Sequence, residues 1–246
     1  MTDLGVGLLL CMGPSLFFLA WFYFRSQYGR ASAAPLVMVF LGGLIAGPVS
    51  LLTFHLLTLI PFYRDLTGIY QAPPDVQFAW CLFAIGPVEE LTKFVVVWAL
   101  VFRRSWFAVP LDGLVYSAAA GLGFASVENW YYLMENDTIL WARAVTLPFN
   151  HVLFSSFWGV GLSFGKFGSP ARRTQMVIIG LLLASVFHGV YDYILVAENV
   201  PDLMILPLVL VLWIWVSAVH GRMKGRTNLD AMSLRKRAGD EGSDPH

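Results

Sequence analysis

Seven apolar runs, each about 20 residues long, constrain the fold of this 246-residue chain more than any other feature. A helix needs about 20 apolar residues to cross the roughly 30 Å hydrocarbon core of a bilayer. The runs cover residues 4–24, 35–60, 77–102, 109–134, 141–164, 174–196 and 203–219. Only 13% of the residues are charged, against about a quarter in an average soluble domain. We therefore expect an all-α, polytopic transmembrane helix bundle of about seven helices.

The lysines and arginines are concentrated in alternate connections between these runs. Thirteen of the 16 basic residues fall in one set of connections and in the C-terminal tail, whereas the other set holds only Arg64 and Arg143. Cytoplasmic loops of membrane proteins carry an excess of lysine and arginine. The pattern therefore predicts an N-terminus outside and a cytoplasmic C-terminus. We expect residues 1–221 to form one helix-bundle domain and residues 222–246 to form a basic, disordered cytoplasmic tail.

The third run contains charged residues where hydrocarbon is expected. Its segment 86–93, with the sequence GPVEELTK, places Glu89, Glu90 and Lys93 inside an apolar stretch. Charges at bilayer depth are costly and usually face a bundle interior or a water-filled cavity, so they indicate a functional site. Glu89 and Lys93 are four residues apart and share one helical face. Pro87 lacks a backbone donor and is expected to bend or restart the helix just before the two acids.

The next three runs contain further acids, histidines and amides: Glu128 and Asn129, Asn150 and His151, and His188 and Asp192. At 1.5 Å per residue, their distances from the outer ends of their helices can be compared. They are about 18 Å for Glu89, 15 Å for His151, 12 Å for His188, 9 Å for Glu128 and 7 Å for Asp192. These overlapping depths predict one site in the outer half of the bilayer. His55 has no acidic neighbour in its run and is expected to be a packing residue.

This set of side chains suits hydrolysis, because a carboxylate can take a proton from water and imidazoles with carboxylates can bind zinc. We expect Glu128, His151 and His188 as metal ligands, with Asp192 as a fourth ligand or an orienting residue. Several buried carboxylates need a cation to offset their charge, and Lys93 supplies only one. Glu89 or Glu90 would be the general base. Adjacent helical residues point about 100° apart, so the sequence leaves open which of the two faces the site.

Three spaced motifs in this order resemble the PrsW family of intramembrane proteases. Residues 89–93 match Glu-Glu-x-x-Lys, residues 124–128 match Phe-x-x-x-Glu, and residues 188–192 match His-x-x-x-Asp. The chain is more distantly similar to the CAAX-processing and bacteriocin-immunity membrane proteases. Those proteins have histidine where Glu128 stands and usually asparagine where Asp192 stands, and this difference favours the PrsW branch.

The resemblance implies that Glu89 and Glu90 are essential, that one of them activates water, and that Glu128, His151, His188 and Asp192 complete the site. It implies a peptidase, commonly described as metal-dependent, in a bacterial plasma membrane. The best-known member of the family cleaves a membrane-bound anti-sigma factor on its extracytoplasmic side. We expect a membrane-anchored protein substrate and a lipid bilayer as partners, with Zn²⁺ as cofactor and no nucleic acid.

Two other functions use the same residues. In a proton- or cation-coupled transporter the acids and histidines would form a relay. Such a relay favours polar residues across both leaflets. In this chain the inner half of the predicted bundle is apolar apart from Lys93, which counts against a transporter. In a non-catalytic membrane scaffold the polar groups would only fix the register of the helices. Alanine substitutions would then damage assembly rather than chemistry.

Overall fold

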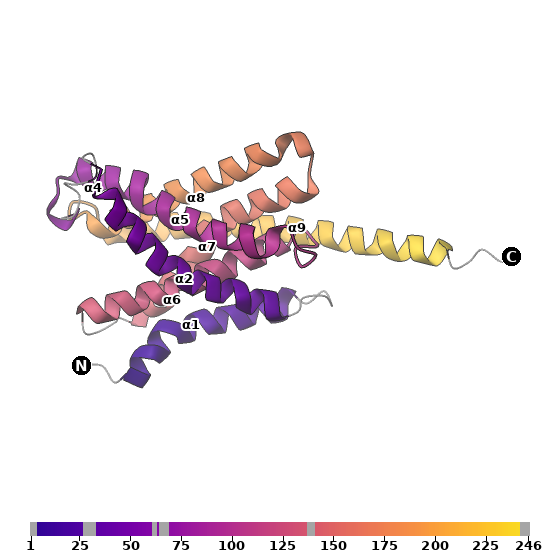
Figure 1. Cartoon of the computed structure of the whole chain (residues 1–246), viewed down its shortest axis with the longest axis horizontal. Coiled ribbons are helices and arrows are strands. Elements are labelled where there is room, and N and C mark those ends of the chain that lie inside the picture. Colours follow the sequence, from indigo (N-terminus) through magenta and orange to yellow (C-terminus); the bar gives the residue numbers. More distant parts are fainter. Residues whose placement is uncertain (1–3, 27–32, 61–62, 64–68, 137–140, 242–246) are drawn as a thin grey trace.

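The computed structural model describes residues 4–26, 33–60, 63, 69–136 and 141–241 (Figure 1). Within these residues the chain is helical and contains no β-strand. Six long helices are α1 (Leu4–Ser26), α2 (Ala33–Leu57), α6 (Asp112–Asn136), α7 (Trp141–Phe167), α8 (Arg173–Val196) and α9 (Ile205–Glu241). A seventh segment joins α4 (Pro74–Trp80), η2 (Cys81–Ile85), α5 (Gly86–Val97) and η3 (Trp98–Phe102) without a break. Short 3₁₀ turns are η1 (Ile69–Gln71), η4 (Pro170–Arg172) and η5 (Asp202–Met204). The expected all-α bundle of about seven helices is confirmed.

The seventh segment changes its helical form just before the two adjacent glutamates. Its residues 81–85 form a π-helical turn, and α5 then begins at Gly86, with Pro87 in its first turn. Proline has no backbone N–H, and its ring clashes with the carbonyl four residues earlier in a regular α-helix. The π-helical turn lies just before this proline. The expected restart of the helix at Pro87 is therefore present.

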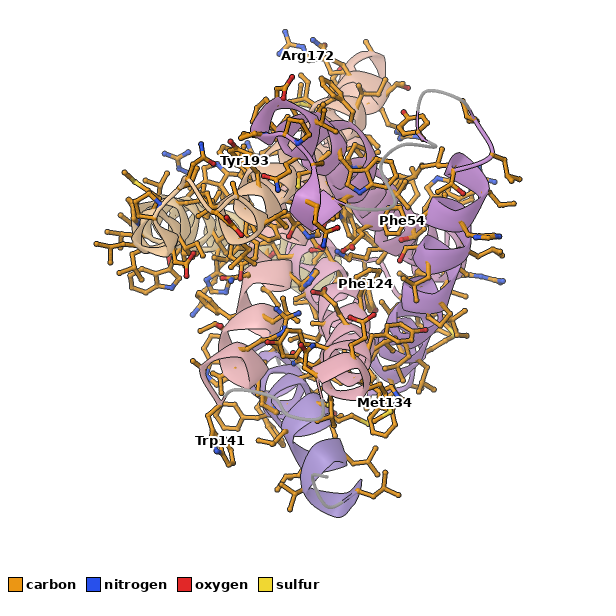
Figure 2. All side chains as sticks on the ribbon, turned by 90° about the vertical axis from the view of Figure 1, so that its left-hand side faces the viewer. Phe54, Phe124, Met134, Trp141, Arg172 and Tyr193 are labelled. Atoms are coloured by element: carbon orange, nitrogen blue, oxygen red, sulfur yellow. The ribbon has the colours of Figure 1, made fainter. Side chains whose placement is uncertain are left out.

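Helices α6 and α7 form the centre of the bundle, and the more apolar helices surround them. Helix α6 packs against α1, α2 and α7, and α7 packs against α8. Viewed from the left-hand side of Figure 1, Phe124 of α6 lies inside the bundle and the exposed Trp141 lies at its edge (Figure 2). In the described part of the chain, four stretches are long and apolar enough to cross a membrane: Leu4–Phe24, Ala33–Leu57, Arg173–Val196 and Asp202–Thr227.

Many large apolar side chains on these outer helices are exposed, including Phe17, Leu52, Leu182 and Leu206. A soluble protein rarely exposes apolar surface on this scale. In a bilayer the same side chains contact lipid, and the less apolar α6 and α7 are shielded from it. The division between an apolar exterior and a more polar centre therefore agrees with a multi-pass membrane protein.

Glycines allow the helices to approach closely at two crossings. At Gly123 of α6 a Cβ atom would collide with the carbonyl oxygen of Phe40 in α2. At Gly86 of α5 a Cβ atom would collide with the carbonyl oxygen of Ser185 in α8. Small residues at such contacts are typical of membrane helix bundles. The second crossing matters for function, because it brings the Glu89–Lys93 turn against α8.

Helix α9 continues into the segment that we expect to be the tail. It continues to Glu241, beyond the apolar run that ends near residue 219 and through most of the segment expected to be disordered. Residues after 219 include many good helix formers, such as arginine, lysine, methionine, leucine and alanine, which extend a helix already started in the apolar run. In Figure 1, α9 projects past the other helices toward the C-terminus.

Candidate active site

Glu90 lies at the centre of a buried polar cluster. Its Oε1 accepts hydrogen bonds from Lys93 Nζ at 2.8 Å and from His188 Nδ1 at 2.9 Å. Its Oε2 accepts hydrogen bonds from Ser155 Oγ at 3.0 Å and from Trp158 Nε1 at 2.8 Å. The side chain is fully buried, and both oxygens already have two donors. Glu90 therefore fixes the positions of α5, α7 and α8 relative to one another and has little capacity left to accept a proton from water.

Lys93 is the cation of this cluster and is also fully buried. Its Nζ lies 2.8 Å from Glu90 Oε1, 3.5 Å from Glu89 Oε2 and 2.8 Å from His151 Nδ1. It also lies 4.0 Å from the centre of the Phe124 ring. A lysine ammonium only donates hydrogen bonds, so Nδ1 of His151 accepts and Nε2 carries the hydrogen. That Nε2 donates to Glu128 Oε2 at 2.8 Å.

His188 presents a free ring nitrogen to two carboxylates. When the ring is neutral and its Nδ1 donates to Glu90, its Nε2 carries the lone pair. This Nε2 lies 3.6 Å from Glu89 Oε2 and 3.5 Å from Asp192 Oδ2. The His188 ring stacks on Phe154 with 4.7 Å between ring centroids, which limits its rotation. Oδ2 of Asp192 is buried and makes no hydrogen bond among the described residues.

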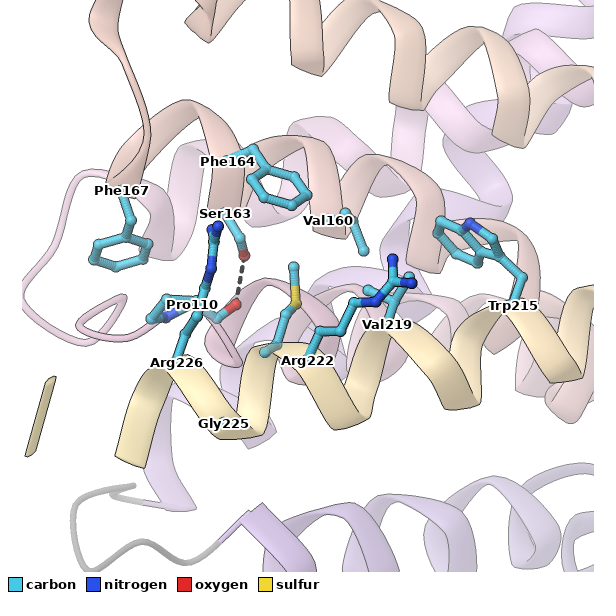
Figure 3. A pocket seen from close by; sticks show the side chains of 11 residues that line it. Pro110, Val160, Ser163, Phe164, Phe167, Trp215, Val219, Arg222, Gly225 and Arg226 are labelled. Atoms are coloured by element: carbon cyan, nitrogen blue, oxygen red, sulfur yellow. Dashed lines mark hydrogen bonds between the residues drawn. The ribbon is translucent and has the colours of Figure 1, made fainter. Parts of the chain in front are cut away.

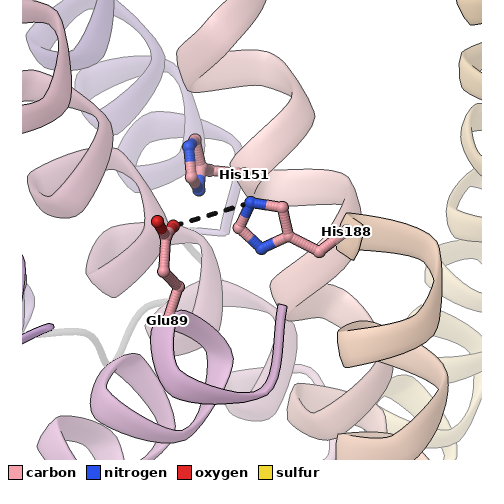
Figure 4. A group of neighbouring side chains, drawn as sticks. All are labelled: Glu89, His151 and His188. Atoms are coloured by element: carbon pink, nitrogen blue, oxygen red, sulfur yellow. Dashed lines mark ion pairs between the residues drawn. The ribbon is translucent and has the colours of Figure 1, made fainter. Parts of the chain in front are cut away.

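Glu89, His151 and His188 are close enough together that they could hold a metal ion. They offer three ligand atoms that lie within 4.8 Å of one another, and all three side chains are buried (Figure 4). Two imidazoles and one carboxylate with a free position are typical of catalytic zinc sites. The Nδ1–H of His188 bonded to Glu90 matches the carboxylate partner that metal-ligating histidines usually have. Both ring nitrogens of His151 already have partners. To bind a metal ion, either Nδ1 must release Lys93 or Nε2 must release Glu128.

Glu128 lies outside this group of three, although the sequence indicated it as a metal ligand. Its Oε1 accepts a hydrogen bond from Arg143 Nη2 at 3.0 Å, and its Oε2 pairs with His151. Its side chain is 31% exposed, whereas the His151 side chain is 1% exposed. Arg143 also lies over the ring of Tyr132, with 4.2 Å from Cζ to the ring centre. Glu128 and Arg143 thus form the more open edge of the cluster.

The structure brings all seven residues expected at the site into one connected network: Glu89, Glu90, Lys93, Glu128, His151, His188 and Asp192. Ser155 and Trp158, which donate to Glu90, were not predicted from the sequence. These residues follow His151 by four and seven positions on α7, so they share its helical face, and this spacing could have identified them. The ion pair of Arg143 with Glu128 was not predicted either, because Arg143 lies near the start of the next apolar run, outside the run that contains Glu128.

An α-helical bundle with an apolar exterior and a cluster of ionisable side chains in its interior is a membrane protein with a functional site below its surface. Comparison with known proteins gives the class of function. Residues 32–219 match the family model described as PrsW family intramembrane metalloprotease. No solved structure matches the chain.

Curated relatives carry the same description. The chain is 32% identical over 190 residues to the protein named Protease PrsW of Geobacillus kaustophilus. The matched region covers 76% of this chain and 79% of that protein. It is 27% identical over 207 residues to the Protease PrsW of Bacillus subtilis, covering 82% and 88% of the two chains. It is 27% identical over 212 residues to that of Clostridioides difficile, covering 83% and 86%.

The chain belongs to the PrsW family of intramembrane metalloproteases. It is therefore a peptidase that works within a membrane, as the motifs predicted, and this favours hydrolysis over the transporter and scaffold alternatives.

Proposed function

We propose that this protease hydrolyses a peptide bond of a membrane-anchored protein, close to the outer leaflet of a bacterial plasma membrane. The single observation that carries the proposal is the grouping of Glu89, His151 and His188 within 4.8 Å of one another. His151 is closer to the first residue of α7 than to its last. His188 is closer to the last residue of α8 than to its first. Both of these helix ends lie on the predicted outer side.

We infer that Glu89, His151 and His188 hold the metal ion, and that the ion is Zn²⁺. A zinc ion held by these residues would activate a water molecule and polarise the carbonyl of the scissile bond. This assignment gives Glu89 the ligand role that the sequence analysis gave to Glu128. The distance of 3.6 Å between His188 Nε2 and Glu89 Oε2 supports it, because a metal ion between these two atoms could bind both.

Asp192 is the proposed general base. Its buried Oδ2 has no hydrogen-bond donor among the described residues, so it can accept a proton from the attacking water. The same carboxyl group can then return that proton to the nitrogen of the leaving amine. Glu90 orients His188 through Nδ1, and Lys93 offsets the negative charge of Glu89 and Glu90. Glu128 and Arg143, at the open edge, are placed to contact the substrate chain as it enters.

The proposed substrate is a single-pass membrane protein such as an anti-sigma factor. This part of the proposal rests on the resemblance to the PrsW family and on the predicted position of the site. A cut near the outer end of a transmembrane segment releases the outer domain of the substrate and leaves a shortened membrane stub. Such a stub is suited to a further proteolytic step.

The proposal is tested by mapping cleavage products in cells that produce the wild-type chain, Asp192→Asn or Glu135→Gln. Glu135 is an exposed acid near the end of α6 and is not part of the site network, so Glu135→Gln serves as the matched control. New protein ends are identified by mass spectrometry in membranes and medium. We expect at least one membrane protein to be cut in the outer half of its transmembrane segment, or just outside it, with wild type and Glu135→Gln only.

Two results would contradict the proposal. Cleavage that persists with Asp192→Asn would remove Asp192 from the catalytic residues. Cleavage products cut only at the cytoplasmic ends of transmembrane segments would show that the site lies near the cytoplasmic leaflet and not near the outer one.

A further inference from the structure

A groove of about 660 Å³ lies between α7 and α9, away from the active site. Its walls are mainly apolar and aromatic and include Val160, Phe164 and Phe167 of α7 and Trp215 and Val219 of α9 (Figure 3). This volume is within the range of small-molecule binding sites, which is about 300–1,000 Å³. The groove therefore has room for part of a molecule with an apolar portion.

Two positively charged side chains line the groove. Arg222 and Arg226, one helical turn apart on α9, reach from this helix toward α7 (Figure 3). Cζ of Arg226 lies 5.6 Å from the centre of the Phe164 ring. Among the described side chains, no carboxylate forms an ion pair with either arginine. Two guanidinium groups that line an apolar groove can donate charged hydrogen bonds to a negatively charged ligand.

Helix α9 is the least buried of the four apolar stretches, with 6% of its apolar window inside the bundle. It contacts α7 through the stack of Trp215 on Phe157, at 3.9 Å between ring centroids. In a bilayer the remaining surface of α9 contacts lipid, and so does the groove beside it. The positive-inside pattern places Arg222 and Arg226 near the cytoplasmic surface, where phospholipid head groups lie.

We propose that this groove binds one anionic phospholipid. The lipid phosphate lies between Arg222 and Arg226, which can donate paired hydrogen bonds to it, and an acyl chain follows the apolar wall past Phe164 toward Trp215. A lipid suits this groove better than a substrate helix, because its negative group matches the two arginines and its acyl chain matches the apolar wall. The bound lipid would join α9 to α7 where these helices otherwise make few contacts.

The test is lipid retention by the full-length, detergent-purified chain, measured by native mass spectrometry. Equal amounts of dioleoylphosphatidylglycerol, which is anionic, and dioleoylphosphatidylcholine, which is zwitterionic, are added. We expect wild type to retain the anionic lipid in preference. The Arg222→Ala/Arg226→Ala variant is expected to lose about tenfold in affinity for it, because it lacks the charge-assisted hydrogen bonds.

The matched control is Arg103→Ala/Arg172→Ala, which removes the same charge from exposed positions on the predicted cytoplasmic side, outside the groove. It should retain the anionic lipid as wild type does. An equal loss in both double variants would show general attraction to a basic surface and would overturn the site. Absence of any preference in wild type would overturn it as well.

A second pair of variants tests the apolar part of the groove while keeping both arginines. Val219→Phe fills the groove, whereas Val211→Phe adds the same bulk at an exposed position on the same helix. We expect only Val219→Phe to weaken retention of the anionic lipid. Equal retention in the two variants would contradict an acyl chain in the groove. None of these measurements depends on protease activity, so they are independent of the proposed function.

Discussion

Glu89 and Glu90 are neighbours in the sequence, but their surroundings give them different functions. Glu90 receives four hydrogen bonds and is fully buried, whereas Glu89 contacts Lys93 and His188 only at 3.5 and 3.6 Å. The sequence could place both acids in one helical turn but could not determine the rotation of that turn. The rotation depends on which side of α5 meets α8, which is a property of the packing.

At the residue scale, we predict that Glu90 stabilises the fold, whereas Asp192 takes part in the cleavage reaction. Glu90→Gln leaves the buried Lys93 without its nearest counter-charge and should cost about 3 kcal/mol of unfolding free energy. Asp192→Asn should lower the cleavage rate by about 10²- to 10⁴-fold, as expected for loss of a general base, with little change in stability. Thermal unfolding in detergent and cleavage assays separate the two effects. Similar stability losses in both variants would contradict this division.

Ser155 and Ser156 provide a matched pair for the hydrogen bonds around Glu90. Both are buried on α7, but Ser155 donates to Glu90 and Ser156 donates to a carbonyl in its own helix. Ser155→Ala should lower the unfolding free energy by about 1–3 kcal/mol, because it removes a donor to a buried carboxylate. Ser156→Ala should have a smaller effect. The unfolding midpoints in detergent measure both, and equal shifts would argue against the central role of Glu90.

At the scale of elements, close helix crossings hold the catalytic groups together. Gly86→Ala places a methyl group against the backbone of Ser185, so α5 and α8 must separate and Glu89 must move away from His188. We predict loss of cleavage and a lower unfolding midpoint. Gly221→Ala on α9, where an added Cβ meets no atom within 4 Å, is the control and should stabilise its helix by about 1 kcal/mol. Full activity in Gly86→Ala would show that this contact is not required.

The lengths of the apolar runs predicted the helices to within a few residues, because crossing a bilayer fixes the length of a helix. The extension of α9 beyond residue 219 was not predicted, since a polar, basic composition is compatible with both helix and disorder. The site network followed from matched depths. Its donors Ser155 and Trp158 were missed because serine and tryptophan in an apolar run indicate no particular chemistry by themselves.

At the scale of the whole molecule, the distribution of charge predicts orientation in the membrane. A green fluorescent protein fused after residue 246 should fluoresce, because it folds in the cytoplasm. An alkaline phosphatase fused at the same place should stay inactive, because it needs the oxidising outer compartment. The opposite pair of results would show that the bundle has the opposite orientation in the membrane, with the site near the cytoplasmic leaflet.

The central claim is that Glu89, rather than Glu128, joins His151 and His188 in holding a metal ion. Elemental analysis of detergent-purified wild type, Glu89→Gln and Glu128→Gln tests it most directly. We predict about one zinc ion per chain in wild type, a similar content in Glu128→Gln, and little metal in Glu89→Gln, with all three chains folded. Zinc retained by Glu89→Gln but lost from Glu128→Gln, or no metal in folded wild type, would contradict the account.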